Sequence, residues 1–205
     1  MGHDEERRFT AAEALARLKA GNARFVRGEA RFPTLQKEIL ASLAKGQRPY
    51  ATLLGCSDSR VPPELVFDAG FGELFIIRLA GNVLSAEVAG TMQYAGTHLK
   101  TPLFVVLGHE GCGAVQAALL AKRHGARDRS RIEALLANIL PALEEVDPGL
   151  PAEEQMRAAV EANVRWTMRQ ILETPEAQAR QAEGVMQLVG AVYKLETGVV
   201  RFLDA

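Results

Sequence analysis

The only two cysteines of the chain lie in short polar stretches, and each stretch holds a further residue that can bind a metal. Residues 56 to 60 read Cys-Ser-Asp-Ser-Arg, and residues 108 to 113 read Gly-His-Glu-Gly-Cys-Gly. Cys56, Asp58, His109 and Cys112 therefore offer two thiolates, a carboxylate and an imidazole. This set suits one tetrahedral zinc ion.

Asp58 stands two residues before Arg60, close enough for the guanidinium to form a bidentate pair with its carboxylate. That pair would hold Asp58 off a metal bound by Cys56, His109 and Cys112. Three protein ligands and an open fourth position are typical of catalytic zinc. If the pair breaks, Asp58 can close the site as a fourth ligand.

Each of these residues also has an ordinary interpretation. A buried cysteine is usually a small hydrophobic residue, and Cys56 could also form a disulfide with Cys112. His109 alone would be a hydrogen-bonded loop residue, and Asp58 with Arg60 a surface salt bridge. An enzyme with Cys56 as nucleophile and His109 as its base is a further alternative, which bound zinc would exclude. The combination of all these types favours the metal site.

The elements that must position these residues are short strands. Four apolar runs, rich in β-branched residues and without alternation, are typical of strands covered on both faces. They span residues 51–54, 74–79, 103–107 and 185–192, with helical patterns at 87–99 and 114–123 between them. In an α/β sheet, ligands bind beyond the carboxyl ends of the strands. Cys56 and His109 therefore belong to one edge, on strands that could be neighbours, and Cys112 opens the next helix, whose N-terminus favours a thiolate.

Further helices are expected on both sides of this region. Thr10 begins a helix with a capping box, residues 35–43 form a second, and the chain is helical again from Ser130. A turn at 196–198 predicts a hairpin that adds an antiparallel edge strand. We predict one α/β domain over residues 1–205, with about four parallel strands plus the antiparallel edge strand, flanked by helices and preceded by a helical arm over residues 1–45.

Composition narrows the class of protein. The 205 residues are 48% hydrophobic and 24% charged, which is ordinary for a soluble globular domain. A net charge of −1 directs the chain neither to nucleic acid nor to an acidic membrane. No run approaches the roughly 20 apolar residues of a membrane span, and the charged residues 1–8 do not read as a secretory signal. We expect a cytoplasmic protein, in which paired cysteines are more often metal-bound or catalytic than disulfide-bonded.

The two motifs together resemble those of the β-class carbonic anhydrases, zinc lyases that interconvert carbon dioxide and bicarbonate. Shorter pieces agree with this resemblance, at residues 78–82, 92–95, 163–164 and 189–193. It implies that Cys56, His109 and Cys112 bind one Zn2+ per chain, with Asp58 and Arg60 as the catalytic dyad. It also implies a homodimer or a dimer of dimers, in which the N-terminal arm packs on the partner subunit.

The resemblance extends to a substrate pocket and a subtype. One subtype surrounds carbon dioxide with Gln, Phe and Tyr, and Gln47, Phe75 and Tyr94 stand at matching places. The other subtype carries a tryptophan three residues before the first cysteine and a non-catalytic bicarbonate site. Here that position is Leu53, so the chain resembles the first, plant-like subtype, in which the aromatic residues come from the partner subunit. His98 is either an exposed polar residue or, by resemblance, a proton relay to solvent.

The charge of the ligands bears on the chemistry. Carbon dioxide would be attacked by zinc-bound hydroxide, and zinc with three histidines gives its water a pKa of about 7. Two thiolates cancel the charge of the ion, so we expect a higher apparent pKa here and an activity that rises with pH. Two other functions fit the same motifs. One is hydrolysis of carbon disulfide or carbonyl sulfide, and the other is a non-catalytic bicarbonate- or zinc-binding regulatory protein.

Overall fold

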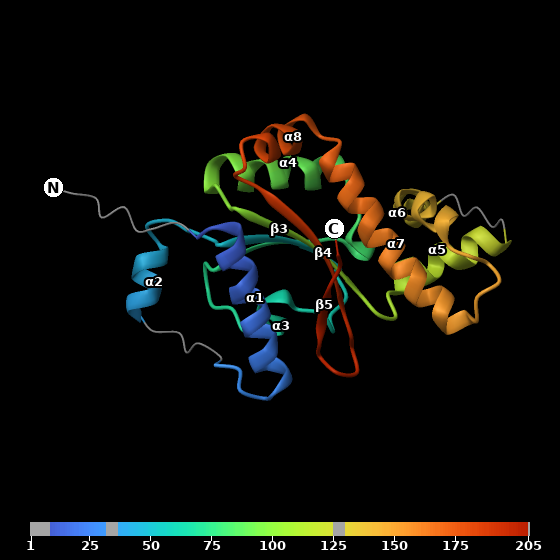
Figure 1. The fold of residues 1–205 in the computed structure, drawn as a ribbon, viewed down its shortest axis with the longest axis horizontal. Helices are drawn as coiled ribbons and strands as arrows, with labels where there is room; N and C mark the ends of the chain where they lie inside the picture. The colour runs from blue at the N-terminus through green and yellow to red at the C-terminus, as the bar shows by residue number, and fades with distance from the viewer. Residues whose placement is uncertain (1–8, 32–36, 125–129, 205) are drawn as a thin grey trace.

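A five-stranded sheet with helices on both faces forms the centre of the molecule (Figure 1). The computed structural model describes residues 9–31, 37–124 and 130–204. The strands lie in the order β2-β1-β3-β4-β5, in which β1 to β4 are parallel and β5 is antiparallel to β4. Their bounds are β1 Ala51–Gly55, β2 Leu74–Arg78, β3 Leu103–His109, β4 Gln187–Tyr193 and β5 Val200–Phe202. The predicted fold class is confirmed, including the antiparallel edge strand.

Two hydrophobic cores lie on opposite faces of this sheet because successive side chains of a strand point to opposite sides. Leu54, Phe104 and Val106 contribute to one core, and Leu53 and Val105 to the other. The first core packs against α4 (Ala86–Tyr94), α5 (Gly113–His124), α6 (Arg131–Ile139), η3 (Leu140–Glu145), α7 (Ala152–Leu172) and α8 (Pro175–Ala182). The second packs against α1 (Ala11–Val26) and α3 (Pro63–Val66). Both faces are therefore covered, as the uniformly apolar strands require.

The long helix α7 crosses the sheet closely because two strand residues have no side chain. A Cβ on Gly108 would lie 2.6 Å from Val164, and one on Gly190 would lie 3.0 Å from the same valine. Val164 is fully buried, and Val160 is nearly so. The close approach brings the α7 side chains down to the carboxyl edge of the sheet.

Helix α1 is held on the sheet of its own chain. The Thr10 capping box is present, and Leu18 is fully buried. Asn22 donates to the carbonyl groups of Val66 and Gly198, and its oxygen accepts from the amide of Val200. Of the predicted arm over residues 1–45, α1 thus belongs to the domain of its own chain, and α2 (Lys37–Leu43) follows it. No helix of the described ranges is long and apolar enough to cross a membrane.

Candidate metal centre

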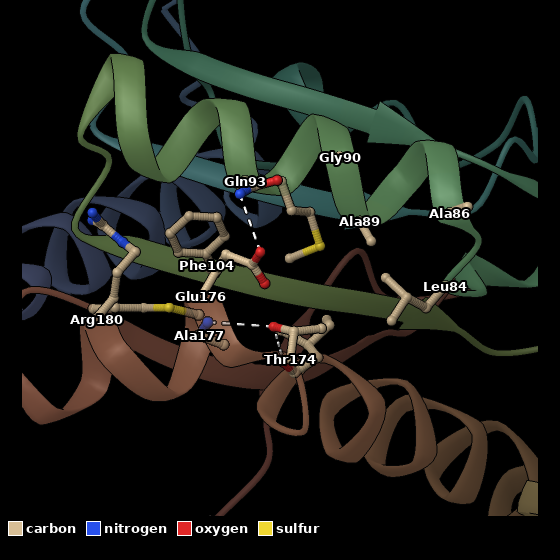
Figure 2. Close-up of a pocket in the computed structure, with 13 residues that line it drawn as sticks. Leu84, Ala86, Ala89, Gly90, Gln93, Phe104, Thr174, Glu176, Ala177 and Arg180 are labelled. Atoms are coloured by element: carbon tan, nitrogen blue, oxygen red, sulfur yellow. Dashed lines mark hydrogen bonds between the residues drawn. The ribbon is translucent and has the colours of Figure 1, made fainter.

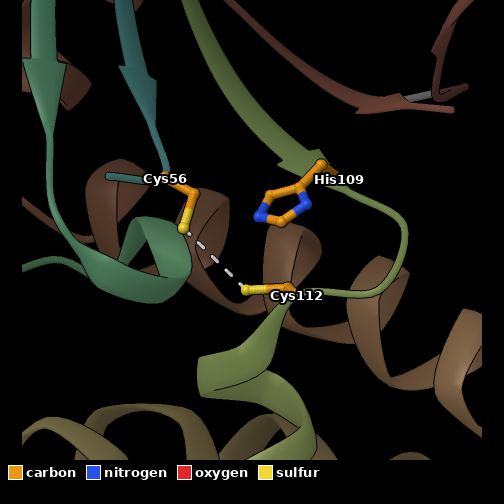
Figure 3. Close-up of side chains that lie close together, drawn as sticks. All are labelled: Cys56, His109 and Cys112. Carbon is orange, nitrogen blue, oxygen red and sulfur yellow. Dashed lines mark hydrogen bonds between the residues drawn. The ribbon is translucent and has the colours of Figure 1, made fainter. Parts of the chain in front are cut away.

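Three side chains converge at the carboxyl edge of the sheet (Figure 3). Cys56 follows β1 directly, His109 is the last residue of β3, and Cys112 immediately precedes α5. Because β1 and β3 are parallel neighbours, both strands deliver their ligands to the same place. The candidate ligand atoms of the three residues all lie within 4.8 Å of one another, and all three side chains are buried. The predicted convergence of the two motifs is confirmed.

The distance between the two sulfur atoms matches a shared metal ion. Cys56 Sγ and Cys112 Sγ are 3.9 Å apart, and both cysteines are free. A disulfide requires about 2.05 Å, whereas two sulfurs at about 2.3 Å from a tetrahedral zinc lie roughly 3.8 Å apart. The disulfide alternative therefore does not describe this structure.

His109 presents the correct nitrogen to the site. Its Nδ1 donates to the carbonyl group of Glu110 at 2.9 Å, so the unprotonated nitrogen of the neutral ring is Nε2. Nε2 is buried and has no hydrogen-bond partner. A buried, unpaired acceptor beside two thiols is costly unless a ligand satisfies it. The residues present therefore fit a zinc ion, with the tautomer fixed in advance.

The Asp58–Arg60 pair has formed beside this cluster. Asp58 Oδ1 accepts from the backbone amide and Nε of Arg60, both at 2.9 Å, and Oδ2 accepts from Nη2 at 2.7 Å. Arg60 also reaches the carbonyl group of Gly111, and Asp58 Oδ2 lies 3.8 Å from His109 Nε2. The side-chain hydrogen bonds from Arg60 hold the pKa of the Asp58 carboxyl well below its usual range. Asp58 is thus an ionised acceptor at the rim of the cluster.

The two thiols differ in acidity in the metal-free chain. The hydrogen bond with Cys112, with further help from His109 and from the amide of Gly81, lowers the pKa of Cys56 to about 4. The neighbouring Cys56 sulfur and burial raise the pKa of Cys112, although the amides of Ala114 and Val115 oppose this. The amides at the helix N-terminus thus favour a thiolate at Cys112, but in the metal-free chain the neighbouring sulfur and burial outweigh them. A bound metal ion supplies the positive charge that allows both sulfurs to be thiolates at once.

Arg78, to which sequence reasoning gave no role, fixes the loop that carries Cys56 and Asp58. Its Nε donates to the carbonyl group of Cys56 at 2.9 Å, and its Nη2 donates to that of Asp58 at 2.6 Å. Arg78 ends β2 opposite Gly55 of β1, so the strand register places it beside the loop. Its position at a strand end, next to the run that precedes Cys56, was the available signal.

The predicted pocket residues do not join the metal cluster within one chain. Phe75 lies opposite Thr52 in the β1–β2 register, four residues before Cys56 and thus roughly 13 Å away along the strand. Tyr94 ends α4, and its ring centroid lies 6.1 Å from that of Phe75. Gln47 precedes β1 by four residues. All three therefore lie nearer the amino ends of the strands than the carboxyl ends, where the metal ligands are.

His98 lies in the π-helical turn Ala95–Leu99 that continues α4, and its side chain is exposed. Its ring centroid is 5.0 Å from that of Tyr94. Turns of this type often occur at functional sites. His98 thus packs beside the aromatic pair of Phe75 and Tyr94.

A separate cavity of about 280 Å³ lies between α4 and α8 (Figure 2). Small and apolar residues line much of it, including Ala89, Gly90, Phe104 and Ala177. No predicted ligand, dyad or pocket residue lines it. Because it holds no candidate for the chemistry, the carboxyl edge of the sheet remains the candidate site.

Known proteins are similar to this chain over most of its length. The family profile described as carbonic anhydrase matches residues 51–200. A carbonic anhydrase of Mycolicibacterium smegmatis is 40% identical over 184 residues, covering 89% of this chain and 88% of that protein. Carbonic anhydrase 2 of Mycobacterium tuberculosis is 38% identical over 183 residues, covering 88% and 87%. The solved β-carbonic anhydrase of Coccomyxa is 27% identical, with a TM-score of 0.75 over 92% of this chain and 86% of that one.

Proposed function

The chain belongs to the β-class carbonic anhydrase family and catalyses the zinc-dependent, reversible hydration of carbon dioxide, and we propose which of its residues perform this reaction. Cys56, His109 and Cys112 hold the zinc ion. The bound ion makes a water molecule available as a nucleophile near neutral pH. The observation that carries the assignment is the buried Nε2 of His109, which has no hydrogen-bond partner and lies beside two sulfurs 3.9 Å apart.

Asp58 and Arg60 serve as the dyad in this proposal. The ionised Asp58 carboxylate accepts a hydrogen bond from the attacking water and so orients it toward carbon dioxide. Arg60 occupies both carboxylate oxygens and keeps Asp58 from becoming a fourth ligand. Arg78 holds the backbone of the loop so that the carboxylate and the Cys56 sulfur keep their relative positions.

The substrate pocket is proposed to require a second copy of the chain. Phe75 and Tyr94 lie toward the amino ends of the strands, whereas the metal ligands of the same chain lie at the carboxyl ends. Tyr94 is 45% exposed. This placement suits side chains that serve the site of a partner subunit, together with Gln47. We propose a homodimer or a dimer of dimers, with the segment over residues 1–45 contributing to the contact between subunits. His98, beside Tyr94, is proposed to pass protons from the pocket to solvent.

Two free thiols that serve as metal ligands also suit a reducing compartment, so we propose a cytoplasmic location.

The assignment is tested by stopped-flow carbon dioxide hydration alongside metal analysis. The purified chain should contain one zinc per chain, and Cys56→Ser should lose both zinc and activity. Ser57→Ala, at the adjacent residue, is the matched control and should keep both. A Cys56→Ser variant that retains full zinc and full activity would contradict the ligand assignment.

A further inference from the structure

One backbone amide outside the two motifs points at a proposed metal ligand. The amide of Gly81 donates to Cys56 Sγ at 3.4 Å from within the short turn η1 (Ala80–Asn82). Gly81 has a φ of +70°, in the left-handed region, and a Cβ there would lie 2.8 Å from Ile139. A glycine at this position therefore allows the turn to approach the sulfur with its N–H directed at it.

Two buried side chains of α7 hold this turn in place. Asn163 Nδ2 donates to the carbonyl group of Gly81 at 2.8 Å, and Thr167 Oγ1 donates to that of Asn82 at 3.3 Å. Asn163 and Thr167 are each 1% exposed. Two hydrogen bonds thus hold Gly81, one on each side of its Cα. Its N–H donates to the Cys56 sulfur, and its carbonyl group accepts from Asn163. The direction of the amide depends on a helix that supplies no proposed ligand.

We propose that Asn163 is a positioning residue of the metal centre: by holding Gly81, it keeps an N–H hydrogen bond on the Cys56 sulfur and limits the charge which that sulfur donates to the metal. A hydrogen bond to a ligand sulfur draws electron density away from the metal, which stays a stronger Lewis acid. This offsets part of the loss of acidity that two thiolates impose. The inference rests on the proposed zinc ligands.

The test uses the protein loaded with Co2+, whose thiolate-to-cobalt charge-transfer bands report on the sulfur. Asn163→Leu keeps the number and branching of the side-chain heavy atoms and removes the donor. Loss of the hydrogen bond raises the energy of the sulfur lone pair, so the bands should move to longer wavelength. In the zinc protein, the midpoint of the pH–activity profile should move to higher pH, with kcat/KM below that midpoint lowered about tenfold.

A matched control separates positioning from simple loss of packing. Val164→Ala removes buried contacts at the next position of α7 but none of the hydrogen bonds that hold the turn, and it should leave the bands in place. Thr167→Val should shift them in the same direction but less, and it serves as the test variant if Asn163→Leu does not fold. Unmoved bands in the folded test variant, or an equal shift in Val164→Ala, would overturn the inference. Failure of the unmutated chain to bind cobalt through Cys56 would instead overturn the proposed ligands.

Discussion

At the scale of single residues, the centre depends on which atoms of each side chain are already engaged. The carbonyl group of Glu110 occupies Nδ1 of His109 and leaves Nε2 for the metal. Arg60 occupies both oxygens of Asp58 in the same way and keeps the carboxylate ionised. One neighbour thus sets the protonation state of each functional group. Removal of that neighbour should change the chemistry without removing the metal.

Arg60→Ala is the first prediction at this scale. Without the guanidinium, Asp58 is free to move the short distance to the metal and close the open position, and kcat should fall by about 100-fold or more. Zinc should stay bound at one per chain, as measured by metal analysis beside stopped-flow hydration. Arg27→Ala is the matched control because Arg27 pairs with Glu29 at the same spacing, on the surface. The dyad assignment fails if Arg60→Ala is as active as this control.

The pH profile gives a second prediction. Because the pKa of Asp58 is depressed, its carboxylate is ionised above its unfolded-state pKa of about 3.9 and stays so until the pH falls through the lower folded-state value. The rise of activity between about pH 6 and 9 therefore belongs to the water at the metal and not to Asp58. Asp58→Asn should lower kcat and keep the inflection. A flat profile in the unmutated chain, or an inflection that vanishes in Asp58→Asn, contradicts this account.

At the scale of elements, the sequence predicts what local patterns and parallel-sheet topology determine. The four apolar runs correspond to β1 to β4, and the rule that ligands gather at the carboxyl ends of strands placed Cys56 and His109 together. The roles of Arg78 and Asn163 were not assigned from the sequence, because they depend on contacts between residues 20 or more positions apart. Helix α8 was not distinguished as a separate element within the helical region predicted from Ser130 on, since its eight residues are too short to show periodicity, although Thr174 caps it before a proline.

Helix α1 provides the prediction that belongs to this scale. A Cβ on Gly21 would lie 1.8 Å from the backbone oxygen of Phe67, so Gly21→Ala should separate α1 from α3 and cost about 1–3 kcal/mol. Gly90→Ala, within α4, has open space around the new Cβ and should stabilise the protein by roughly 0.5–1 kcal/mol. Urea unfolding of the zinc-loaded proteins measures both. Equal effects of the two substitutions would mean that α1 does not pack on its own chain as described.

At the scale of the whole molecule, one chain separates the metal ligands from the proposed pocket. The ligands follow β1 and β3 at the carboxyl edge, whereas Phe75 and Tyr94 lie toward the other end of the strands. A sequence cannot show this separation, because both groups of residues carry the family pattern equally well. The separation makes subunit pairing a testable part of the catalytic site.

Mixing two variants of low activity tests that pairing. Asp58→Asn carries a damaged dyad and an intact pocket, and a Phe75→Ala, Tyr94→Ala double variant carries the reverse. If each pocket serves the partner's metal, random mixing into twofold dimers should restore about a quarter of the unmutated activity, since half the dimers are mixed and each has one intact site. Mixing two samples of the same variant is the control. No recovery after verified subunit exchange would assign the pocket to its own chain or to no role.

Two sulfurs and one imidazole are proposed to hold the zinc and to leave its fourth position to an oxygen or nitrogen atom. X-ray absorption at the zinc edge of the purified protein tests this most directly. We expect two sulfur atoms at about 2.3 Å and two nitrogen or oxygen neighbours at about 2.0–2.2 Å, one of them an imidazole nitrogen. A shell of nitrogen and oxygen alone, or one with a single sulfur, would contradict it.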